Sequence, residues 1–329
     1  MVNLPPVSIV IPVFGNKAIE RGQLVSVFRA LEAYPSGGEV VIAVDVSTNY
    51  NRTALLQEFP SLLFWEHDNS DGWETVVSLA TECANHDALV FLNPDVYPEP
   101  DFILPLIGRL LENQVFCVQS AIFDERRNID PYCLARCAFR WGTLRRFPTR
   151  ELGKEGWLSL HPCGGSMVFD RLKLVQLGLG SLITTFWGGS DLGLRAWRRG
   201  WETWLEPRSV GLLSVRESKK NSSEQRRIRC IRQRNKLLVE WIHFPLYALL
   251  AFGIPKLLFK VIFSLIVGDF GYFVALSGAF SIRSQVRRIR SEIKSTERLS
   301  FHSILVMIAN ENAMHTELER KSVRGCCNV

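Results

Sequence analysis

The chain has 329 residues, of which 47% are hydrophobic and 22% are charged. This composition suits a globular protein with one large domain plus an appendage, or with two domains. The eight cysteines show neither a disulfide framework nor the paired spacing of a zinc site, and no signal peptide opens the chain. We therefore expect reduced thiols and an active domain in the cytosol. The formal net charge is +6, and residues 216–236 carry nine Lys and Arg against two Glu, so the basic character belongs to one segment.

The first 115 residues alternate between apolar runs and amphipathic segments. Three segments have the helical spacing of apolar residues, at 18–34, 52–58 and 73–85. Four apolar runs predict strands, at residues 7–13, 40–44, 62–65 and 88–92. This alternation is typical of βαβ units, and hence of an α/β fold with a mostly parallel sheet and helices on both faces. In such sheets, ligands bind beyond the carboxyl ends of the strands.

Two aspartates stand at predicted strand ends. Asp45 follows the second apolar run, and Asn93-Pro94-Asp95 follows the fourth. Mg²⁺ and Mn²⁺ prefer hard oxygen ligands, often one or two protein carboxylates together with substrate phosphates. Asp95 is therefore a candidate ligand for a cation that neutralises a nucleotide diphosphate, and the Asn93 amide is a candidate contact for ribose or phosphate. The alternative is an aspartate that merely caps the next helix, which begins near Asp101, and these residues alone favour neither interpretation.

Several blocks of residues together resemble bacterial family 2 glycosyltransferases of the GT-A fold, close to their rhamnosyltransferase-like branch. In chain order the blocks are 7–16, 40–45, 89–96, 163–171, and 186–201 with Glu206-Pro207 after it. The resemblance covers roughly residues 7–240. It implies an inverting transferase that uses a nucleotide-diphosphate sugar, such as a UDP- or dTDP-sugar, with a divalent metal, Mg²⁺ or Mn²⁺.

The resemblance also implies roles for individual residues. The first block would place Pro12 and Phe14 in the nucleotide-sugar site, and Asp45 would contact the base. Asn93 and Asp95 would bind the diphosphate, and Asp95 would also hold the metal. On the acceptor side the expected residues are Gly164, Gly165 and Trp187, and those near the diphosphate are Arg234 and Asn235.

The sequence departs from the family pattern where the catalytic base is expected. The family carries Glu-Asp before the acceptor-side helix, and one of these acids deprotonates the acceptor hydroxyl. Here the two positions are Gly188 and Gly189, and only the later Asp191 is retained. Asp191 is either the substitute base, which we expect, or an N-cap of the following helix. Alternatively another acid is the base, or the chain binds nucleotide sugar without transferring it. The other candidate acids are Glu151, Glu155 and Glu206.

Aromatic and basic residues are dense in the second half of the chain. Trp187, beside the two glycines, is the expected sugar contact, although tryptophans at this density also suit core filling. Residues 226–238 combine a basic face with an apolar stripe, which suits an anionic membrane surface near a lipid-linked acceptor. A solvated charged face is the alternative. Nucleic acid is not an expected partner, because no nucleic-acid-binding fold accompanies this segment.

Residues 241–282 are the most hydrophobic part of the chain, but prolines, two lysines and Asp269 interrupt them. The longest uncharged piece, 241–255, has fifteen residues, whereas a spanning helix needs about 20. We therefore expect peripheral or re-entrant helices at the cytoplasmic face of the inner membrane; a buried helical subdomain is the alternative.

The expected organisation has four parts. Residues 1–115 form the nucleotide-sugar-binding half of the GT-A domain, and residues 116–240 form its acceptor-binding half. Residues 241–300 form membrane-associated helices, and residues 301–329 form a tail. The expected acceptor is a surface glycan or its lipid-linked precursor. The alternative function is a non-catalytic protein that binds nucleotide sugar or organises a glycan-assembly complex.

Overall fold

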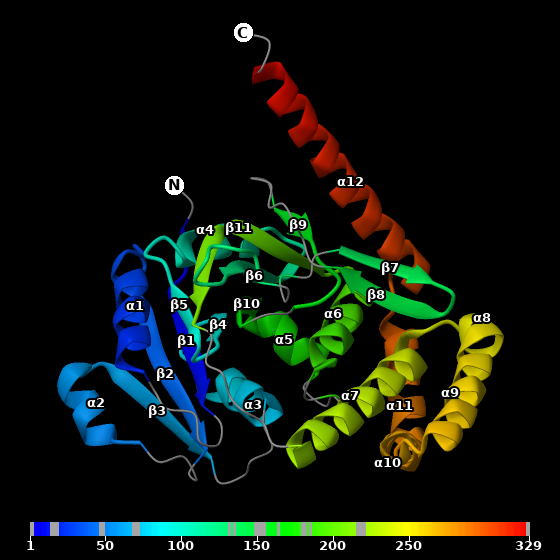
Figure 1. Ribbon diagram of the computed structural model, residues 1–329. Coiled ribbons are helices and arrows are strands. Elements are labelled where there is room, and N and C mark those ends of the chain that lie inside the picture. Colours follow the sequence, from blue (N-terminus) through cyan, green and yellow to red (C-terminus); the bar gives the residue numbers. More distant parts are fainter. Residues whose placement is uncertain are drawn as a thin grey trace.

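The computed structural model describes most of the 329-residue chain. The described residues are 3–13, 20–45, 50–67, 73–130, 133, 136–147, 156–162, 165–178, 183, 186–214 and 222–326. Within them a large mixed sheet lies at the centre, helices pack on both of its faces, and a group of C-terminal helices packs beside it (Figure 1).

The first half of the chain forms four parallel strands joined by helices, as predicted. The strands are β1 (Val7–Val13), β2 (Gly38–Asp45), β3 (Leu62–His67) and β4 (Ala88–Leu92), and the helices are α1 (Arg21–Glu32), α2 (Arg52–Glu58) and α3 (Trp73–Cys83). Their order in the sheet is β3-β2-β1-β4. Every residue of β1 and β4 is buried, because helices cover both faces of the sheet. The predicted strands and helices are confirmed, with bounds that differ by a few residues.

Alternate residues of the central strands define the two faces. Ile9 and Ile11 of β1 pack into the core that also buries apolar residues of α1 and of α4 (Ile103–Leu110). Val10 of β1 and Phe91 of β4 point the other way, into the core formed with α3 and α5 (Arg171–Leu177). The prediction of helices on both faces is therefore confirmed.

The same sheet continues into the second half of the chain. Its further strands are β5 (Val96–Pro98), β6 (Val115–Phe123), β9 (Trp157–Leu158), β10 (Ser166–Asp170) and β11 (Glu202–Leu213). β10 inserts antiparallel between β4 and β6, whereas β11 runs parallel to β6. The sheet is therefore mixed beyond β4. A separate hairpin comprises β7 (Arg136–Arg140) and β8 (Thr143–Phe147), and α6 (Gly188–Arg198) leads into β11.

The C-terminal helices pack on one another and on α6. They are α7 (Ser222–His243), α8 (Leu246–Ala248), the π-helical turn η1 (Leu249–Gly253), α9 (Ile254–Val267), α10 (Phe270–Ser281), α11 (Arg283–Thr296) and α12 (Phe301–Cys326). α7 lies along α10 and also contacts α6 and α11. Gly268 ends α9 with a left-handed φ of 71°, so the hydrophobic segment bends just before Asp269 and does not form one long helix.

Residues 301–326 form a helix, which differs from the expectation of a tail. Phe301, Ile304 and Ile308 are buried in the main core, and the Asn312 side chain donates a hydrogen bond to the Leu158 carbonyl at 3.0 Å. The first half of α12 thus packs against the sheet, and its second half extends beyond the body of the molecule (Figure 1). The apolar residues at 301, 304 and 308 are spaced for a helix, which is the signal that could have indicated it.

Candidate active site

The register of the sheet brings the carboxyl ends of β1, β2 and β4 to one edge. β1 lies between β2 and β4, and the buried Pro12 pairs with Ala43 of β2. Asp45 is the last residue of β2, and Asn93 directly follows β4. The backbone positions predicted for the nucleotide site therefore meet at this edge. Phe14 and the side chain of Asp45 lie outside the described part of the chain.

The Asn93-Pro94-Asp95 loop is held by its own side chains and by α1. The Asn93 side-chain oxygen accepts a hydrogen bond from the Asp95 backbone N–H at 3.0 Å, which closes an Asx turn. Gln23 on α1 is fully buried, and its amide donates to the carbonyls of Asn93 and Val96 at 2.8 and 3.2 Å. Asn93 therefore fixes the shape of the loop. Sequence reasoning missed Gln23, because one glutamine on an amphipathic helix carries no motif.

Gly165 lets the loop approach the start of β10. A Cβ atom at position 165 would lie 2.8 Å from both Asn93 Cβ and Val96 Cγ2, which is too close for any other residue without movement of the loop. The Gly165 carbonyl also accepts a hydrogen bond from the Asn93 backbone N–H. The structure thus places Gly165, predicted for the acceptor, directly against the donor-side loop. Gly164 lies outside the described residues.

Asp95 follows this fixed turn and has a partly exposed side chain. Its backbone carbonyl accepts from the Ser214 N–H at 2.9 Å, which ties the loop to the end of β11. Nearby, the Tyr97 hydroxyl donates to the Glu20 carboxylate. Burial, and secondarily the charge of Asp95, raise the pKa of Tyr97, so this phenol stays protonated and acts as a donor near neutral pH.

The site fits a divalent cation that is completed by its substrate. Among the described residues, no three His, Cys, Asp or Glu side chains gather into a ready metal site. Mg²⁺ and Mn²⁺ are commonly held by only one or two carboxylates, with phosphates and water completing the shell. A single partly exposed carboxylate on a rigid strand-end loop meets this requirement, and Asp95 is the residue that provides it.

Asp191 is buried and fully engaged. It lies in the first turn of α6 with 1% of its surface exposed. One carboxylate oxygen accepts from Arg195 at 2.9 Å, and the other contacts His243 Nε2 at 2.8 Å. Both carboxylate oxygens are thus engaged in the core in this structure, and the predicted role of Asp191 as the substitute base stays a prediction. Asp191 joins α6 to the end of α7.

His243 is the neutral partner in this pair. Burial lowers its pKa from the ordinary value of 6.5, and the positive charges of Arg198 and Arg195 lower it further, whereas Asp191 opposes the shift. The neutral ring donates from Nε2 to Asp191. Within the described residues Nδ1 has no hydrogen-bond partner. In this tautomer Nδ1 carries a lone pair, and leaving it unpaired costs less free energy than leaving a buried N–H unpaired. No sequence motif marks His243, because it lies 52 positions from Asp191.

The lowered pKa of His243 predicts acid-sensitive stability. The unfolded imidazole takes up a proton as the pH falls through 6.5, whereas the folded ring does so only at lower pH, so acid favours unfolding in this window. The expected slope is up to about 1.4 kcal/mol per pH unit. Denaturant unfolding from pH 7.5 down to 5.0 measures it. His243→Gln should flatten the slope relative to the unsubstituted protein, and parallel curves would contradict this account.

Gly188 and Gly189 are packed against backbone. A Cβ at Gly188 would lie 2.5 Å from the Ile183 carbonyl oxygen, and one at Gly189 would lie 2.0 Å from that of Pro162. These are the two positions where the family pattern has acids. In this fold neither position accommodates a side chain unless the start of α6 moves.

We expect Gly189→Ala to lower the stability of the protein. The added methyl group overlaps the Pro162 carbonyl, and overpacking of this kind costs about 1–3 kcal/mol. Gly108→Ala on α4 is the matched control, because a Cβ there meets no described atom within 4 Å and alanine favours the helix. Thermal unfolding should show a lower midpoint for Gly189→Ala and an unchanged or higher one for Gly108→Ala. Equal midpoints would show that α6 shifts freely.

Trp187, Arg234 and Asn235 lie where α6 and α10 meet α7. Trp187 immediately precedes α6, and the Lys236 ammonium lies 5.9 Å from the centroid of its ring. Asn235 is fully buried and accepts from Arg234 Nε at 3.1 Å. The Arg234 side chain passes over Gly278 of α10. The structure therefore shows Arg234 packing α7 against α10, with Asn235 buried beside it, and their predicted diphosphate contact stays a prediction.

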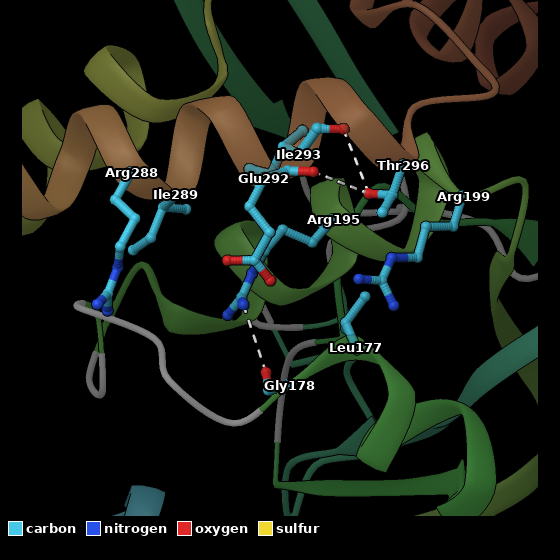
Figure 2. A pocket seen from close by; sticks show the side chains of 9 residues that line it. All are labelled: Leu177, Gly178, Arg195, Arg199, Arg288, Ile289, Glu292, Ile293 and Thr296. Carbon is cyan, nitrogen blue, oxygen red and sulfur yellow. Dashed lines mark hydrogen bonds between the residues drawn. The ribbon is translucent and has the colours of Figure 1, made fainter.

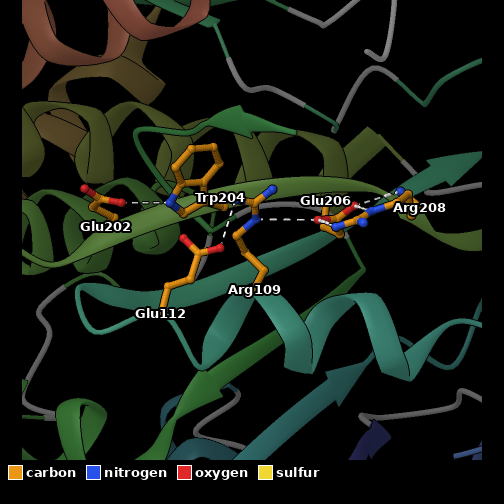
Figure 3. A network of polar contacts seen from close by, with 6 residues as sticks. All are labelled: Arg109, Glu112, Glu202, Trp204, Glu206 and Arg208. Atoms are coloured by element: carbon orange, nitrogen blue, oxygen red, sulfur yellow. Dashed lines mark hydrogen bonds and ion pairs between the residues drawn. The ribbon is translucent and has the colours of Figure 1, made fainter. Parts of the chain in front are cut away.

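Glu206, one of the alternative base candidates, belongs to a network of polar contacts (Figure 3). Its carboxylate is fully buried and accepts from Arg208 Nε and Nη2 at 2.7 and 2.9 Å, and Arg109 Nε lies 3.6 Å away. Arg109 also stacks on Trp204. Glu206 therefore stabilises β11 against α4. The other two candidates, Glu151 and Glu155, lie outside the described residues.

Comparison with solved structures defines the class of fold. The chain is similar to GalNAc-T7, solved with UDP, GalNAc and Mn²⁺, at a TM-score of 0.56 and 16% identity, over 75% of this chain and 49% of that one. It therefore spans about half the length of GalNAc-T7. It is also similar to the mannosyltransferase PcManGT from Pyrobaculum calidifontis in complex with GDP-Man and Mn²⁺, at a TM-score of 0.50 and 14% identity. This match covers 90% of this chain and 86% of PcManGT. At these identities the likeness shows the GT-A-like fold alone.

The family follows from a direct sequence match. The model of glycosyl transferase family 2 matches residues 8–178, more than half of the chain. The chain therefore belongs to glycosyl transferase family 2. No curated protein sequence matches it.

Proposed function

We propose that this chain is an inverting glycosyltransferase of the rhamnosyltransferase-like, bacterial type. The donor is a nucleotide-diphosphate sugar, a UDP- or dTDP-sugar, and the acceptor is a surface glycan or its lipid-linked precursor. The observation that carries the proposal is the Asn93-Pro94-Asp95 loop. It is braced by Gln23 and Gly165 at the carboxyl edge of parallel strands, where ligands of such sheets bind.

In this proposal, different residues bind different parts of the donor. The edge formed by Pro12 and Asp45 receives the nucleotide, with Asp45 toward the base. Asp95 holds Mg²⁺ or Mn²⁺, and Asn93 keeps the Asp95 backbone in place through the Asx turn. When bound, the cation neutralises the diphosphate and stabilises it as a leaving group. Trp187, at the start of α6, provides an apolar face for the acceptor sugar.

The acceptor hydroxyl needs a base to deprotonate it, and several acids of the chain are candidates for this role. The carboxylates of Asp191 and Glu206 are buried and engaged in ion pairs, so among the candidate acids from the sequence we favour Glu151 and Glu155. The packed glycines at 188 and 189 specifically favour one second function. In it, the chain binds nucleotide sugar without transferring it and organises a glycan-assembly complex.

The C-terminal helices favour a membrane location for this activity. Residues Leu246–Val267 are long and apolar enough to cross a membrane, and only 6% of their most apolar stretch is buried, so they are not a core helix. On α9, Lys256 pairs with Glu240 of α7 at 2.7 Å, and Lys260 lies over the Tyr272 ring of α10. Both charges thus face the protein, which suits a helix lying in the cytoplasmic leaflet of the inner membrane with its apolar side outward.

A donor panel tests the proposed activity. The purified full-length protein is incubated with UDP-, dTDP- and GDP-sugars, with Mn²⁺, Mg²⁺ or EDTA, and donor hydrolysis and transfer to membrane extracts are measured. We expect metal-dependent turnover of a UDP- or dTDP-sugar. Donor binding without turnover would establish the non-catalytic function, and the absence of any donor binding would overturn both.

A further inference from the structure

A small cavity lies between α5, α6 and α11, away from the strand-end loop. It has a volume of about 110 Å³ and is lined by Leu177, Gly178, Arg195, Arg199, Arg288, Ile289, Glu292, Ile293 and Thr296. Figure 2 shows Arg195 and Arg199 reaching it from α6, and Arg288 and Glu292 reaching it from α11. Three guanidinium groups and one carboxylate therefore line a space that is large enough for several water molecules.

The buried floor of the cavity carries an unused donor. Arg195 is 8% exposed, donates to the Gly178 carbonyl at 3.3 Å and pairs with Asp191 at 2.9 Å. Its Nε is buried and has no hydrogen-bond partner among the residues that the structure describes. A buried N–H without a partner costs about 1–3 kcal/mol, and an acceptor bound in the cavity would remove that cost.

The rim of the cavity carries more positive than negative charge, because Arg199 and Arg288 line it together with one carboxylate, Glu292. Burial lowers the pKa of Arg199, and the positive charge of Arg195 lowers it further, although Glu292 opposes the shift. Arg288 and Glu292 are both exposed side chains at the mouth, so they can move to admit a ligand. Guanidinium groups are suited to phosphate oxygens, which they bind through paired N–H donors.

We propose that this cavity binds a phosphate group, with Arg195 at the floor and Arg199 and Arg288 at the rim. The group is either the headgroup of an anionic lipid or a free phosphate or pyrophosphate, because the recognition chemistry is the same. Binding would join α6, which carries Asp191, to α11, which directly follows the apolar helix α10. The inference concerns a site separate from the donor site, and it holds whether or not the chain transfers sugar.

The test uses the full-length protein in EDTA, so that a metal-dependent diphosphate site does not contribute. Calorimetry measures binding of inorganic phosphate and pyrophosphate, and sedimentation measures binding to phosphatidylcholine vesicles with and without phosphatidic acid. Arg199→Gln and Arg288→Gln should each weaken binding about tenfold or more, since a charged hydrogen bond is lost. Glu292→Gln should strengthen it several-fold, because it removes a competing carboxylate. Asp95→Asn should leave it unchanged.

Arg287→Gln is the matched control. Arg287 neighbours Arg288 on α11 and is also exposed, but it does not line the cavity. Binding of the soluble anions identifies a free phosphate as the source, and binding of phosphatidic acid vesicles alone identifies a lipid headgroup. The proposal is overturned if neither probe binds, or if Arg287→Gln weakens binding as much as Arg288→Gln does.

Discussion

Asp95→Asn should lower sugar transfer by about 10²–10³-fold while the fold is retained. The substitution keeps the size of the side chain and the hydrogen bond from the Asp95 backbone to Asn93, but it removes the carboxylate proposed to hold the metal. A cation acting on a leaving diphosphate contributes several kcal/mol, and each 1.36 kcal/mol corresponds to tenfold in rate. Initial rates at saturating Mn²⁺, together with the Mn²⁺ concentration needed for half-maximal rate, measure the effect.

Asp101→Asn provides the control for this experiment. Asp101 lies six positions after Asp95, is exposed, and makes the same change of charge when substituted. The rate and the Mn²⁺ dependence of Asp101→Asn should stay within about twofold of those of the unsubstituted protein, because Asp101 lies outside the strand-end loop. If Asp95→Asn behaves like Asp101→Asn, the assignment of the metal to Asp95 is wrong.

Polar substitutions on the exposed face of the C-terminal helices should release the protein from membranes. The apolar surface comprises the exposed side chains Leu246, Tyr247, Leu250, Ile254, Leu258, Phe259, Ile262, Phe263, Leu265, Ile266, Val267, Phe270, Val274 and Phe280. Phe259, Ile266 and Phe270 are 69%, 78% and 75% exposed. Full burial of each is worth about 1.5–3 kcal/mol, so changing all three to serine should reduce vesicle partitioning at least about 100-fold.

A second triple variant tests whether this effect is specific. Leu104, Leu172 and Val175 are also exposed apolar residues, but they lie on α4 and α5 of the GT-A-like domain. Their replacement by serine should leave partitioning into anionic vesicles within about threefold. If the two triple variants lose binding equally, or if the unsubstituted protein stays in the supernatant, the membrane proposal fails.

The sequence predicts the strands and helices of residues 1–115 well, because the apolar patterns that indicate them are local. The β-branched and apolar runs of β1, β2 and β4 can be read within a few residues of one another, and Asp95 directly follows such a run. The residue that holds the loop of this aspartate in place is far away in the sequence. Gln23 reaches the loop from α1, about 70 positions earlier, and nothing in its neighbourhood distinguishes it from a surface residue.

The acceptor half is harder to predict for the same reason. A family pattern identifies Asp191, but its two partners decide what it can do, and the burial of His243 cannot be read from a sequence in which it simply ends a helix. The insertion of β10 between β4 and β6 also depends on a return of the chain from far along the sequence. Pairing of this kind leaves no periodic signal.

The tight packing of Gly188 and Gly189 has a consequence for any redesign of this chain. A single nucleotide change can turn a glycine codon into one for aspartate or glutamate, yet here the new side chain would strike a backbone carbonyl before it could serve any reaction. An acid therefore cannot be introduced at position 188 or 189 by a single substitution unless the start of α6 also moves. A base designed into this chain would have to come from another part of it.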